Sequence, residues 1–379
     1  MLLTGILGTL LILAVLWDAF ETVILPRRVT RRLRLARLFF HYTWLSYSAV
    51  VGSIVPARRQ ETYLSYYGPL SLIILLCIWA TGLIFGFAIL QMSAGSGLNS
   101  PDAASGFATD LYFSGTTFFT LGLGDVTPRT SVARVLTAVE SGMGFGFLAL
   151  VIGYLPLLNQ SFSRREVNIS LLDARAGSPP TAAEMLCRNT HEDKTDSLGQ
   201  VLSEWERWSA ELLESHLSYP VLAYFRSQHD NQSWLTCLTT LLDTSALVLA
   251  GVEGGNVYQA GLTFAMARHA VVDLSQIFHS PPRKPKADRL PPLELASLRE
   301  FLAADGVILR QGSPADEKLT ELRHMYEPYV YSLSKYLCIC LPQWFDERNR
   351  TDNWQTSAWE RKSGYRGAGL PGDRGDEHF

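Results

Sequence analysis

Three long apolar segments constrain the fold of this chain more than any other feature of its sequence. They cover residues 2–25, 66–91 and 132–158, and all lie within the first 160 residues. Each is long enough to cross a hydrocarbon core about 30 Å thick, which takes about 20 helical residues. The remaining residues have the composition of an ordinary soluble domain. We therefore expect an all-α membrane half followed by an aqueous half.

Arginines beside these segments indicate the orientation of the chain. Six of them follow the first segment, at positions 27, 28, 31, 32, 34 and 37. Arg58 and Arg59 precede the second segment, and Arg164 and Arg165 follow the third. Because Lys and Arg concentrate in cytoplasmic loops, we expect a multi-pass protein of the cell inner (plasma) membrane. Its N-terminus would lie outside and its C-terminal domain in the cytoplasm.

A fourth apolar stretch, residues 38–55, does not fit this count. If it crossed the membrane, one of the arginine clusters that flank it would lie outside. Its Tyr, Trp and His side chains suit the headgroup level, so we interpret it as an interfacial or re-entrant helix on the cytoplasmic side. The alternative is a true fourth span, which would place the N-terminus inside.

Two acidic residues lie inside the first apolar segment. Asp18 and Glu21 are three residues apart and therefore share one helical face. Acids at membrane depth are costly and often functional, which makes this pair a possible sensor for gating or for protons. The simpler interpretation, which we favour, is that both pair with the arginines that follow.

Residues 106–128, between the second and third segments, are too short to cross twice as full helices. They are also too apolar for an ordinary external loop. A short helix over 108–119 that enters the membrane, followed by an extended return over 120–125, fits this length. Backbone at that depth is accepted only inside protein or along a water-filled path. The glycines of the return, Thr-Leu-Gly-Leu-Gly-Asp, permit torsions that let successive carbonyls face one axis. The alternative is a glycine-rich turn that binds phosphate.

This stretch resembles the filter signature of potassium channels, usually T-V-G-Y-G-D with a proline shortly after it. The matching residues are Thr120, Gly122, Gly124, Asp125 and Pro128. Leu121 replaces valine, and Leu123 replaces a tyrosine whose hydrogen bond a leucine cannot make. The second pore loop of some tandem-pore potassium channels looks similar. The resemblance covers about residues 66–158 and implies four chains around one pore.

The resemblance also implies roles for single residues. It implies an ion-coordinating filter made of Thr120, Leu121, Gly122, Leu123 and Gly124. K⁺ would be held at the first four of these, by rings of oxygens that replace its hydration shell. We expect the filter to be supported by Thr117, Asp125 and Glu140.

Glu140 lies in the outer half of the third apolar segment, where a buried carboxylate needs a partner. We expect a hydrogen bond behind the filter to Ser114, Thr116 or Thr117, which would substitute for the bond lost at Leu123. The alternative is a carboxylate that lines the cavity and concentrates cations.

The same segment holds candidate hinge residues. Gly144 falls at the usual hinge glycine of the family, and we assign a gating hinge to Gly142, Gly144, Gly146 and Pro156. Several close glycines weaken a helix, although small residues also pack closely against a neighbouring helix, and both interpretations stay open. We expect Pro156 to end or kink the helix near the cytoplasmic mouth.

The aqueous half shows helical periodicity without strand alternation. We predict helices over residues 197–216, 220–226, 233–249, 257–277, 291–303 and 315–341. A proline-rich linker, formed by residues 280–286 together with Pro291 and Pro292, divides them. The predicted domains are therefore an N-terminal and interfacial part (1–60), a pore domain (61–165), a cytoplasmic helical domain (166–342) and a disordered tail (343–379).

A polar cluster at 226–234 contains His229 and Asp230, a second possible sensor that could bind a metal or an anion. We favour a polar turn in which Asp230 or Asn231 caps the next helix. Cys338 and Cys340 form a C-x-C pair, which we interpret as free buried thiols. No glycine motif for nucleotides follows a strand here, so the regulatory ligand of this domain stays unidentified.

These features favour one function over two others. A homotetrameric potassium, or weakly selective monovalent cation, channel in the lipid bilayer fits best, with K⁺ as permeant ion and without a cofactor. The alternative is a non-conducting membrane-anchored sensor or scaffold with a pore-like domain. An enzyme is the weakest hypothesis because no nucleophile–base spacing stands out. The net charge of −3 argues against a nucleic-acid partner.

Overall fold

The computed structural model describes residues 1–25, 35–99, 106–190, 197–228, 232–346, 352 and 355. It divides into two compact units, Met1–Gln160 and Ser161–Phe379. The regular secondary structure of the described residues is helical apart from two short strands and one isolated bridge. This composition confirms the expected all-α class.

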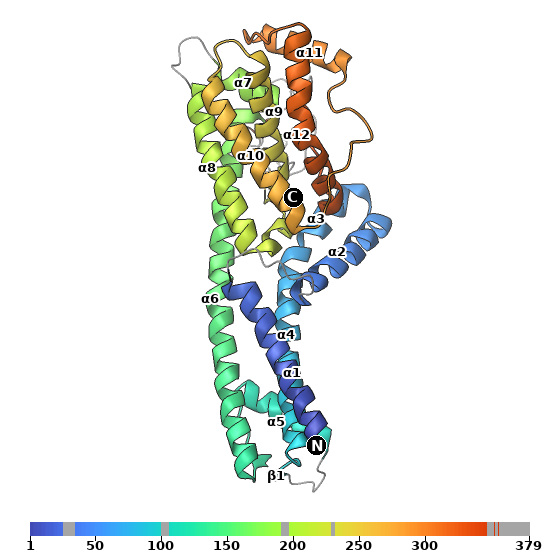
Figure 1. Cartoon of the computed structure of the whole chain (residues 1–379), viewed down its shortest axis with the longest axis vertical. Coiled ribbons are helices and arrows are strands. Elements are labelled where there is room, and N and C mark those ends of the chain that lie inside the picture. The colour runs from blue at the N-terminus through green and yellow to red at the C-terminus, as the bar shows by residue number, and fades with distance from the viewer. Residues whose placement is uncertain are drawn as a thin grey trace, which may run out of the picture. The chain divides into compact units, whose positions relative to one another are not determined.

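The first unit holds, wholly or in part, three helical stretches that are long and apolar enough to cross a membrane, and its helices are shown in Figure 1. In chain order it contains α1 (Leu2–Ala19), the π-helical turn η1 (Phe20–Ile24), α2 (Leu35–Ile54), α3 (Ala57–Ser65), α4 (Tyr67–Ser93), α5 (Phe107–Phe118) and the first part of α6 (Ser131–Ala176). Three continuous stretches are long and apolar enough to cross: Leu2–Ile24, Ala57–Ser93 and Ser131–Ala176. They contain the three predicted spans, which are thereby confirmed as membrane-compatible helices.

Helices α1 and α4 run side by side and approach each other through small residues (Figure 1). A Cβ atom added at Gly86 would lie 2.5 Å from Ile12 Cγ1, and one added at Gly8 would lie 2.9 Å from the Gly86 carbonyl oxygen. Glycines at such contacts let helix backbones pack closely in lipid, where apolar burial alone does not hold helices together. The N-terminal helix is therefore an integral part of the first unit.

Helix α2 covers the stretch that raised the question of a fourth span. By length and composition it is not apolar enough to cross a membrane, and Figure 1 shows it at a steep angle to α4. Its buried Trp44 ring lies 4.8 Å from the Tyr67 ring of α4. The Tyr67 hydroxyl donates to the Phe40 carbonyl at 2.9 Å. Aromatic residues of this kind gather at membrane interfaces, which supports the interfacial interpretation.

The sequence predicted that Pro156 would end or kink this helix, and helix α6 does not end there. It continues as one helix from Ser131 to Ala176, with Pro156 inside it. A proline inside a helix removes one backbone donor and crowds the carbonyl four residues earlier, which together cost about 3 kcal/mol. Beyond it, Ile169 and Leu172 are fully buried in the second unit. This packing sustains the helix past the proline, so α6 passes from the first unit into the second.

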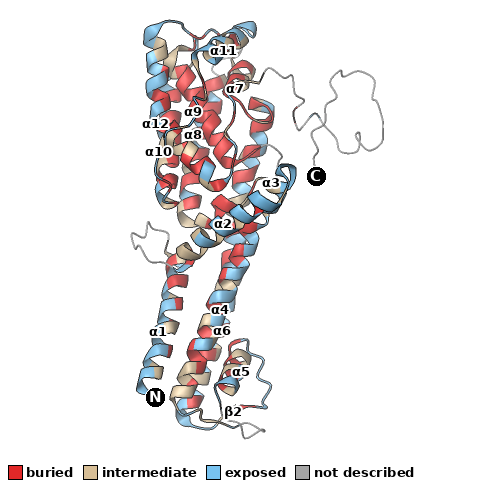
Figure 2. Ribbon diagram, turned by 90° about the vertical axis from the view of Figure 1, so that its right-hand side faces the viewer, coloured by how far each residue is buried: buried red, intermediate tan, exposed pale blue. Residues whose placement is uncertain are grey.

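The second unit is a bundle of helices. It contains α7 (Ala182–Asn189), α8 (Ser197–Ser218), the 3₁₀ turn η2 (Pro220–Tyr224), α9 (Trp234–Gly251), α10 (Val257–Ile277), α11 (Pro292–Ala304) and α12 (Ser313–Leu337). Helix α9 is also apolar enough to cross a membrane, but 83% of its most apolar window is buried within the unit. Figure 2 shows this burial, which makes α9 the core of the bundle.

The cap of α9 differs from the prediction. We expected Asp230 or Asn231 to cap this helix, and both lie outside the described residues. The cap is Ser233, whose hydroxyl oxygen accepts a hydrogen bond from the Thr236 amide at 3.0 Å. A serine directly before the first helical residue is the stronger signal, because its side chain reaches an amide left free by the first turn.

Charged groups attach the linker and the start of the tail to the bundle. The Arg289 guanidinium of the linker donates to Asp243 of α9 at 2.6 Å and to the Pro342 carbonyl at 2.9 Å. Trp344 is 2% exposed and Asp352 is 5% exposed. Packed residues thus occur inside the segment 343–379 that was predicted to be disordered.

The described structure contains five free cysteines. Cys187 and Cys237 are buried, and burial raises the pKa of the Cys187 thiol to about 12. Cys338 and Cys340 are exposed, so the prediction that they are buried is wrong. The reason is local, because Cys338 takes a left-handed φ of 54° that ends α12 and redirects the chain.

Candidate functional site

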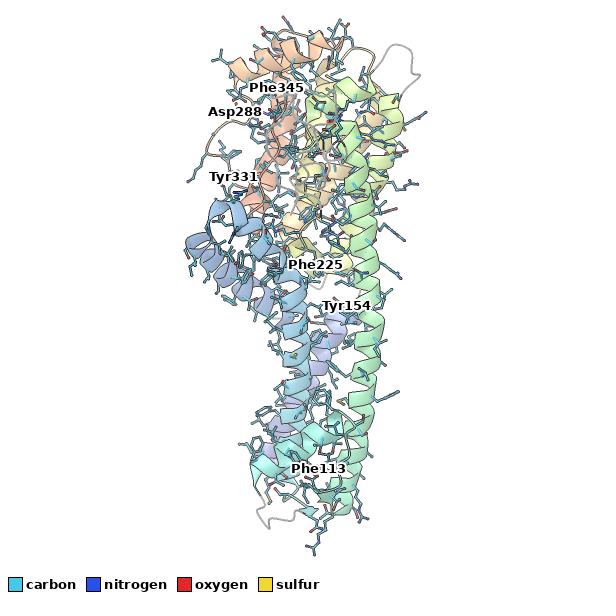
Figure 3. All side chains as sticks on the ribbon, turned by 180° about the vertical axis from the view of Figure 1, so that it is seen from behind. Phe113, Tyr154, Phe225, Asp288, Tyr331 and Phe345 are labelled. Carbon is cyan, nitrogen blue, oxygen red and sulfur yellow. The ribbon has the colours of Figure 1, made fainter. Side chains whose placement is uncertain are left out.

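The pore loop consists of the short helix α5 and the turn that follows it. Helix α5, marked by Phe113 in Figure 3, lies between α4 and α6 in the sequence and begins and ends within a residue of its prediction. The chain then reverses through two hydrogen bonds, from Thr120 N to Thr117 O at 3.0 Å and from Leu121 N to Thr116 O at 2.8 Å. Both bonds hold the return segment against the C-terminal end of α5.

The backbone of the return segment alternates in handedness. Thr120, Gly122 and Gly124 have φ angles of +55°, +54° and +80°, whereas Leu121 and Leu123 lie outside the positive region. Glycine adopts positive φ without steric cost, but a β-branched threonine does not. A strained residue at this position indicates a functional constraint. Alternating handedness turns successive carbonyls towards the same side of the chain.

The same residues are open to solvent in the single chain. Leu121 is 61% exposed and Leu123 is 64% exposed, and all residues from Thr120 to Asp125 are exposed. Large apolar side chains in a row of this kind are unusual on a finished surface. The return segment, residues 120–125 and named the filter segment after the signature it resembles, therefore exposes an apolar surface that is unusual for a single chain.

Tyr112 makes a contact that the sequence reasoning missed. Its hydroxyl donates to Asp125 Oδ2 at 2.8 Å and ties α5 to the outer end of the filter segment. A hydrogen bond to a carboxylate is stronger than one between neutral groups. The only signal in the sequence is a tyrosine about one helical turn before Thr116 and Thr117, followed by an acid at position 125.

Glu140 lies behind the filter segment, on α6. It is fully buried, and Ser114 Oγ of α5 donates to Glu140 Oε2 at 3.3 Å. Ser114 is one of the three predicted partners, whereas the Thr116 hydroxyl donates instead to the Phe113 carbonyl. Within the part of the chain that is described, Glu140 Oε1 has no hydrogen-bond partner. The role of Glu140 in supporting the filter stays a prediction.

Other buried polar contacts fix the outer ends of the helices, and the sequence reasoning did not anticipate them. Ser96, after α4, donates to the fully buried Asp110 of α5 at 2.7 Å. Gln91 of α4 donates to the Ala133 carbonyl of α6 at 3.4 Å. The strands β1 (Leu98–Asn99) and β2 (Thr127–Pro128) pair nearby. The pore loop is thus held on both sides.

Gly144 is the point of closest approach between α6 and the pore helix. A Cβ atom added there would lie 1.9 Å from the Phe118 carbonyl oxygen, a distance that no side chain can occupy. Gly142 and Gly146 have no neighbour within 4 Å of such an atom in the single chain. The contact with Phe118 supports the interpretation that Gly144 is a packing residue. The helix it packs against is α5 and not α4. The hinge role of the glycines stays a prediction.

The two possible sensors have different outcomes. Asp18 accepts hydrogen bonds from the Ala36 amide at 3.1 Å and from Trp79 Nε1 at 2.9 Å, so it joins α1, α2 and α4. Glu21 accepts one from Trp17 Nε1 at 2.8 Å. The arginines at 27–34 lie outside the described residues, as do His229 and Asp230. Asp18 therefore connects three helices through its hydrogen bonds. The sensor roles of Asp18, Glu21, His229 and Asp230 stay predictions.

Comparison with known proteins agrees with this geometry. A family model described as an ion channel matches residues 73–156, from α4 through the pore loop into α6. Residues 73–156 are therefore similar to ion channels, in agreement with the resemblance to a pore-loop family. The chain is also similar to the uncharacterized membrane protein YdjJ of Bacillus subtilis (strain 168). The two are 23% identical over 242 residues, which cover 62% of this chain and 69% of the relative. No solved structure matches the chain.

Proposed function

We propose that the protein is a homotetrameric channel for potassium, or for monovalent cations with weak selectivity, in the cell inner membrane. The observation that carries this proposal is the alternating backbone of Thr120, Gly122 and Gly124, between a pore helix and a membrane-compatible helix. A phosphate-binding turn has no need of a strained threonine or of a pore helix. An enzyme is not supported, because the pore-loop family points to transport.

Four copies of the filter segment would enclose one pathway. The carbonyls of Thr120, Leu121, Gly122 and Leu123 would then form stacked oxygen rings, with Gly124 at the outer end, and replace the hydration shell of K⁺. Helix α5 ends at Phe118, and the negative end of its dipole favours a cation near the inner end of the filter. The exposed Leu121 and Leu123 side chains would be covered by the neighbouring subunits.

Selectivity depends on how rigidly the filter is held. Leu123 cannot make the hydrogen bond of the tyrosine it replaces. The Tyr112–Asp125 bond and the Ser114–Glu140 bond supply two other polar links between the filter surroundings and the helices. These links support a filter that prefers K⁺ over Na⁺. The reversal potential, measured with K⁺ on one side of the membrane and Na⁺ on the other, shows whether the channel selects K⁺ or passes both ions equally.

Flux through purified protein tests the proposal. Protein reconstituted in lipid vesicles should admit thallium or potassium, and Gly122→Asp should stop this flux because it places a side chain and a charge in the filter. Gly106→Asp is the matched control, since Gly106 has extended torsions at the N-cap of α5, where aspartate is favoured. It should retain flux.

The contrary result is also defined. If intact, folded protein passes no ion at any pH, voltage or calcium concentration, the chain is a membrane-anchored scaffold with a pore-like domain. Cross-linking that ends at any number of subunits other than four would contradict the tetramer.

A further inference from the structure

Two charged residues are buried where α6 enters the second unit. Arg165 is 4% exposed and its neighbour Glu166 is 6% exposed. Burial lowers the pKa of the Arg165 guanidinium from its usual value, and the adjacent Glu166 carboxylate acts in the opposite direction. A buried charge is stable only when partners satisfy it.

Both residues are held by one segment of the bundle, residues 220–228, which begins with η2. Arg165 Nη1 donates to the Leu222 carbonyl at 2.9 Å, and Arg165 Nη2 donates to the Phe225 carbonyl at 2.8 Å. Arg165 Nε donates to Glu166 Oε1 at 3.0 Å. All three nitrogens of the guanidinium thus have described partners.

Glu166 also binds the segment 220–228, through residues near its C-terminal end. Its Oε2 atom accepts hydrogen bonds from the Ser227 hydroxyl at 2.5 Å and from the Gln228 amide at 3.2 Å. The Phe162 ring, one turn earlier on α6, lies 5.7 Å from the Phe225 ring, which is labelled in Figure 3. Segment 220–228 therefore contacts one turn of α6 through hydrogen bonds to Arg165 and Glu166 and through the Phe162–Phe225 ring pair.

The same segment is attached to α12. The Tyr224 and Tyr336 hydroxyls are 2.8 Å apart and hydrogen-bonded. Arg226 Nη2 donates to the carbonyl of Leu337, the last residue of α12. A change in the position of α12 would therefore move a segment that holds α6.

We propose that Arg165 and Glu166 are positioning residues through which segment 220–228 couples rearrangements of the cytoplasmic bundle to the pore helix α6. This inference rests on the proposed function, because it assigns α6 to the pore. Networks of buried, fully bonded charges have few alternative arrangements, so they shift between discrete states instead of yielding gradually. Arg165 and Glu166 follow the apolar segment 132–158 by seven and eight residues. A small displacement of α6 at these residues would therefore reach the inner mouth of the pore.

A second ion pair on α6 provides the matched control. Arg175 and Glu204 join α6 to α8 at 2.5 Å, but their side chains are 34% and 52% exposed. Exposed pairs contribute little because water and salt screen them. If any charge contact on α6 served equally well, loss of Glu204 would have the same effect as loss of Glu166.

Single-channel recording of the full chain in lipid bilayers tests the proposal. We expect Glu166→Gln to change the open probability about fivefold or more, the lower range of allosteric coupling. The unitary conductance and the reversal potential should stay unchanged. Glu204→Gln should leave all three quantities unchanged. Ser227→Ala removes one bond and leaves the charged pair in place, so it gives the same direction of change if Glu166→Gln fails to fold.

A double variant separates coupling from general damage. Because Glu166→Gln and Ser227→Ala disrupt the same bond, their combined effect should match that of Glu166→Gln alone and not the sum. Equal open probabilities in wild type, Glu166→Gln and Ser227→Ala would overturn the proposal. A changed unitary conductance would also overturn it, since the pair would then belong to the conduction path.

Failure of the channel function has its own signature. If the wild-type protein carries no current, the proposed function fails, and the coupling is then measured by hydrogen exchange of residues 158–176. Glu166→Gln and Ser227→Ala should both increase exchange there, and Glu204→Gln should not. Unchanged exchange in the first two variants would overturn the coupling.

Discussion

The Tyr112 hydroxyl is the only part of that side chain that the Asp125 contact requires, so Tyr112→Phe tests the contact alone. We expect the filter of this variant to lose its conducting shape more readily. Macroscopic currents should then decay several-fold faster and the preference for K⁺ over Na⁺ should fall. Tyr258→Phe is the control, because Tyr258 is 78% exposed on α10. Currents of Tyr112→Phe that match wild type in decay and selectivity would show that the bond supports nothing.

His216 predicts how stability depends on pH. It is fully buried on α8 and its Nδ1 atom bonds the Leu212 carbonyl at 2.8 Å. Burial and the nearby Arg165 charge lower its pKa from 6.5 to about 3. Between these values the unfolded chain binds a proton that the folded protein does not, so stability falls as the pH falls below 6.5. At pH 5 the loss is about 2 kcal/mol, from about 1.4 kcal/mol per pH unit.

Unfolding of the full chain in detergent, followed by tryptophan fluorescence between pH 7 and pH 5, measures this loss. His216→Phe should have a shallower slope than wild type, because it lacks the group that titrates. His269→Phe retains His216 and replaces a side chain that is 60% exposed, so it should keep the wild-type slope. Parallel slopes in wild type and His216→Phe would contradict the assignment. Neutral and buried, His216 is not a pH sensor in the physiological range.

At this scale the sequence predicted partners only where spacing along a helix limits them. Ser114 was among three hydroxyls expected near Glu140, and the structure selects it. The Tyr112–Asp125 bond depends on how the chain reverses after α5, which the residue types alone do not determine. Asp18 was assigned to the arginines that follow it, because opposite charges are the obvious partners. Its described partners are a backbone amide and an indole, and the arginines at 27–34 lie outside the described residues.

Among the elements, the crossing of α5 and α6 depends on the absence of a side chain at Gly144. Gly144→Ala would place a methyl group 1.9 Å from the Phe118 carbonyl oxygen, so α5 or α6 must shift. Overpacking of this kind costs about 1–3 kcal/mol. We expect a lower melting temperature and reduced flux in vesicles, because Phe118 ends the helix that carries the filter.

Gly146→Ala is the matched control for this substitution. It lies on the same helix, two residues further on, and has no neighbour within 4 Å of an added Cβ in the single chain. Alanine also favours a helix more than glycine does. If Gly144→Ala melts and conducts like wild type while Gly146→Ala does not, the close approach of α5 and α6 is wrong.

Helices with a strong apolar period were the easiest elements to predict. Helix α10 has its predicted bounds, Val257–Ile277, and α5 is displaced by one residue. Two of the differences concern helix ends. Helix α6 passes Pro156 because burial of Ile169 and Leu172 outweighs the cost of the proline. Helix α12 ends at Leu337, before the predicted 341, because Cys338 adopts a left-handed conformation that residue type does not reveal.

For the whole molecule, hydropathy alone does not separate the helices of the first unit from the core of the second. Helix α9 passes the same length and composition test as α1, α4 and α6. What distinguishes it is burial, since its apolar surface is covered by neighbouring helices of the second unit. Conversely, α2 is helical over nearly the length of a span without being apolar enough. Membrane placement thus follows from tertiary packing as well as from composition.

Three crossing helices would place residue 3 and the second unit on opposite sides of the membrane, whereas a crossing α2 would place them on the same side. Leu3 is 82% exposed, and Asn99 is exposed between α4 and α5. We expect a membrane-impermeant thiol reagent to label Leu3→Cys and Asn99→Cys in intact cells. The native Cys338 and Cys340, exposed in the second unit, should react only after the membrane is opened. Asn99→Cys serves as the control, because it lies outside under both topologies.

Protection of Leu3→Cys in intact cells, with Asn99→Cys labelled, would make α2 a fourth span. Aromatic contacts such as Trp44–Tyr67 would then lie within the hydrocarbon, away from the headgroups that suit them.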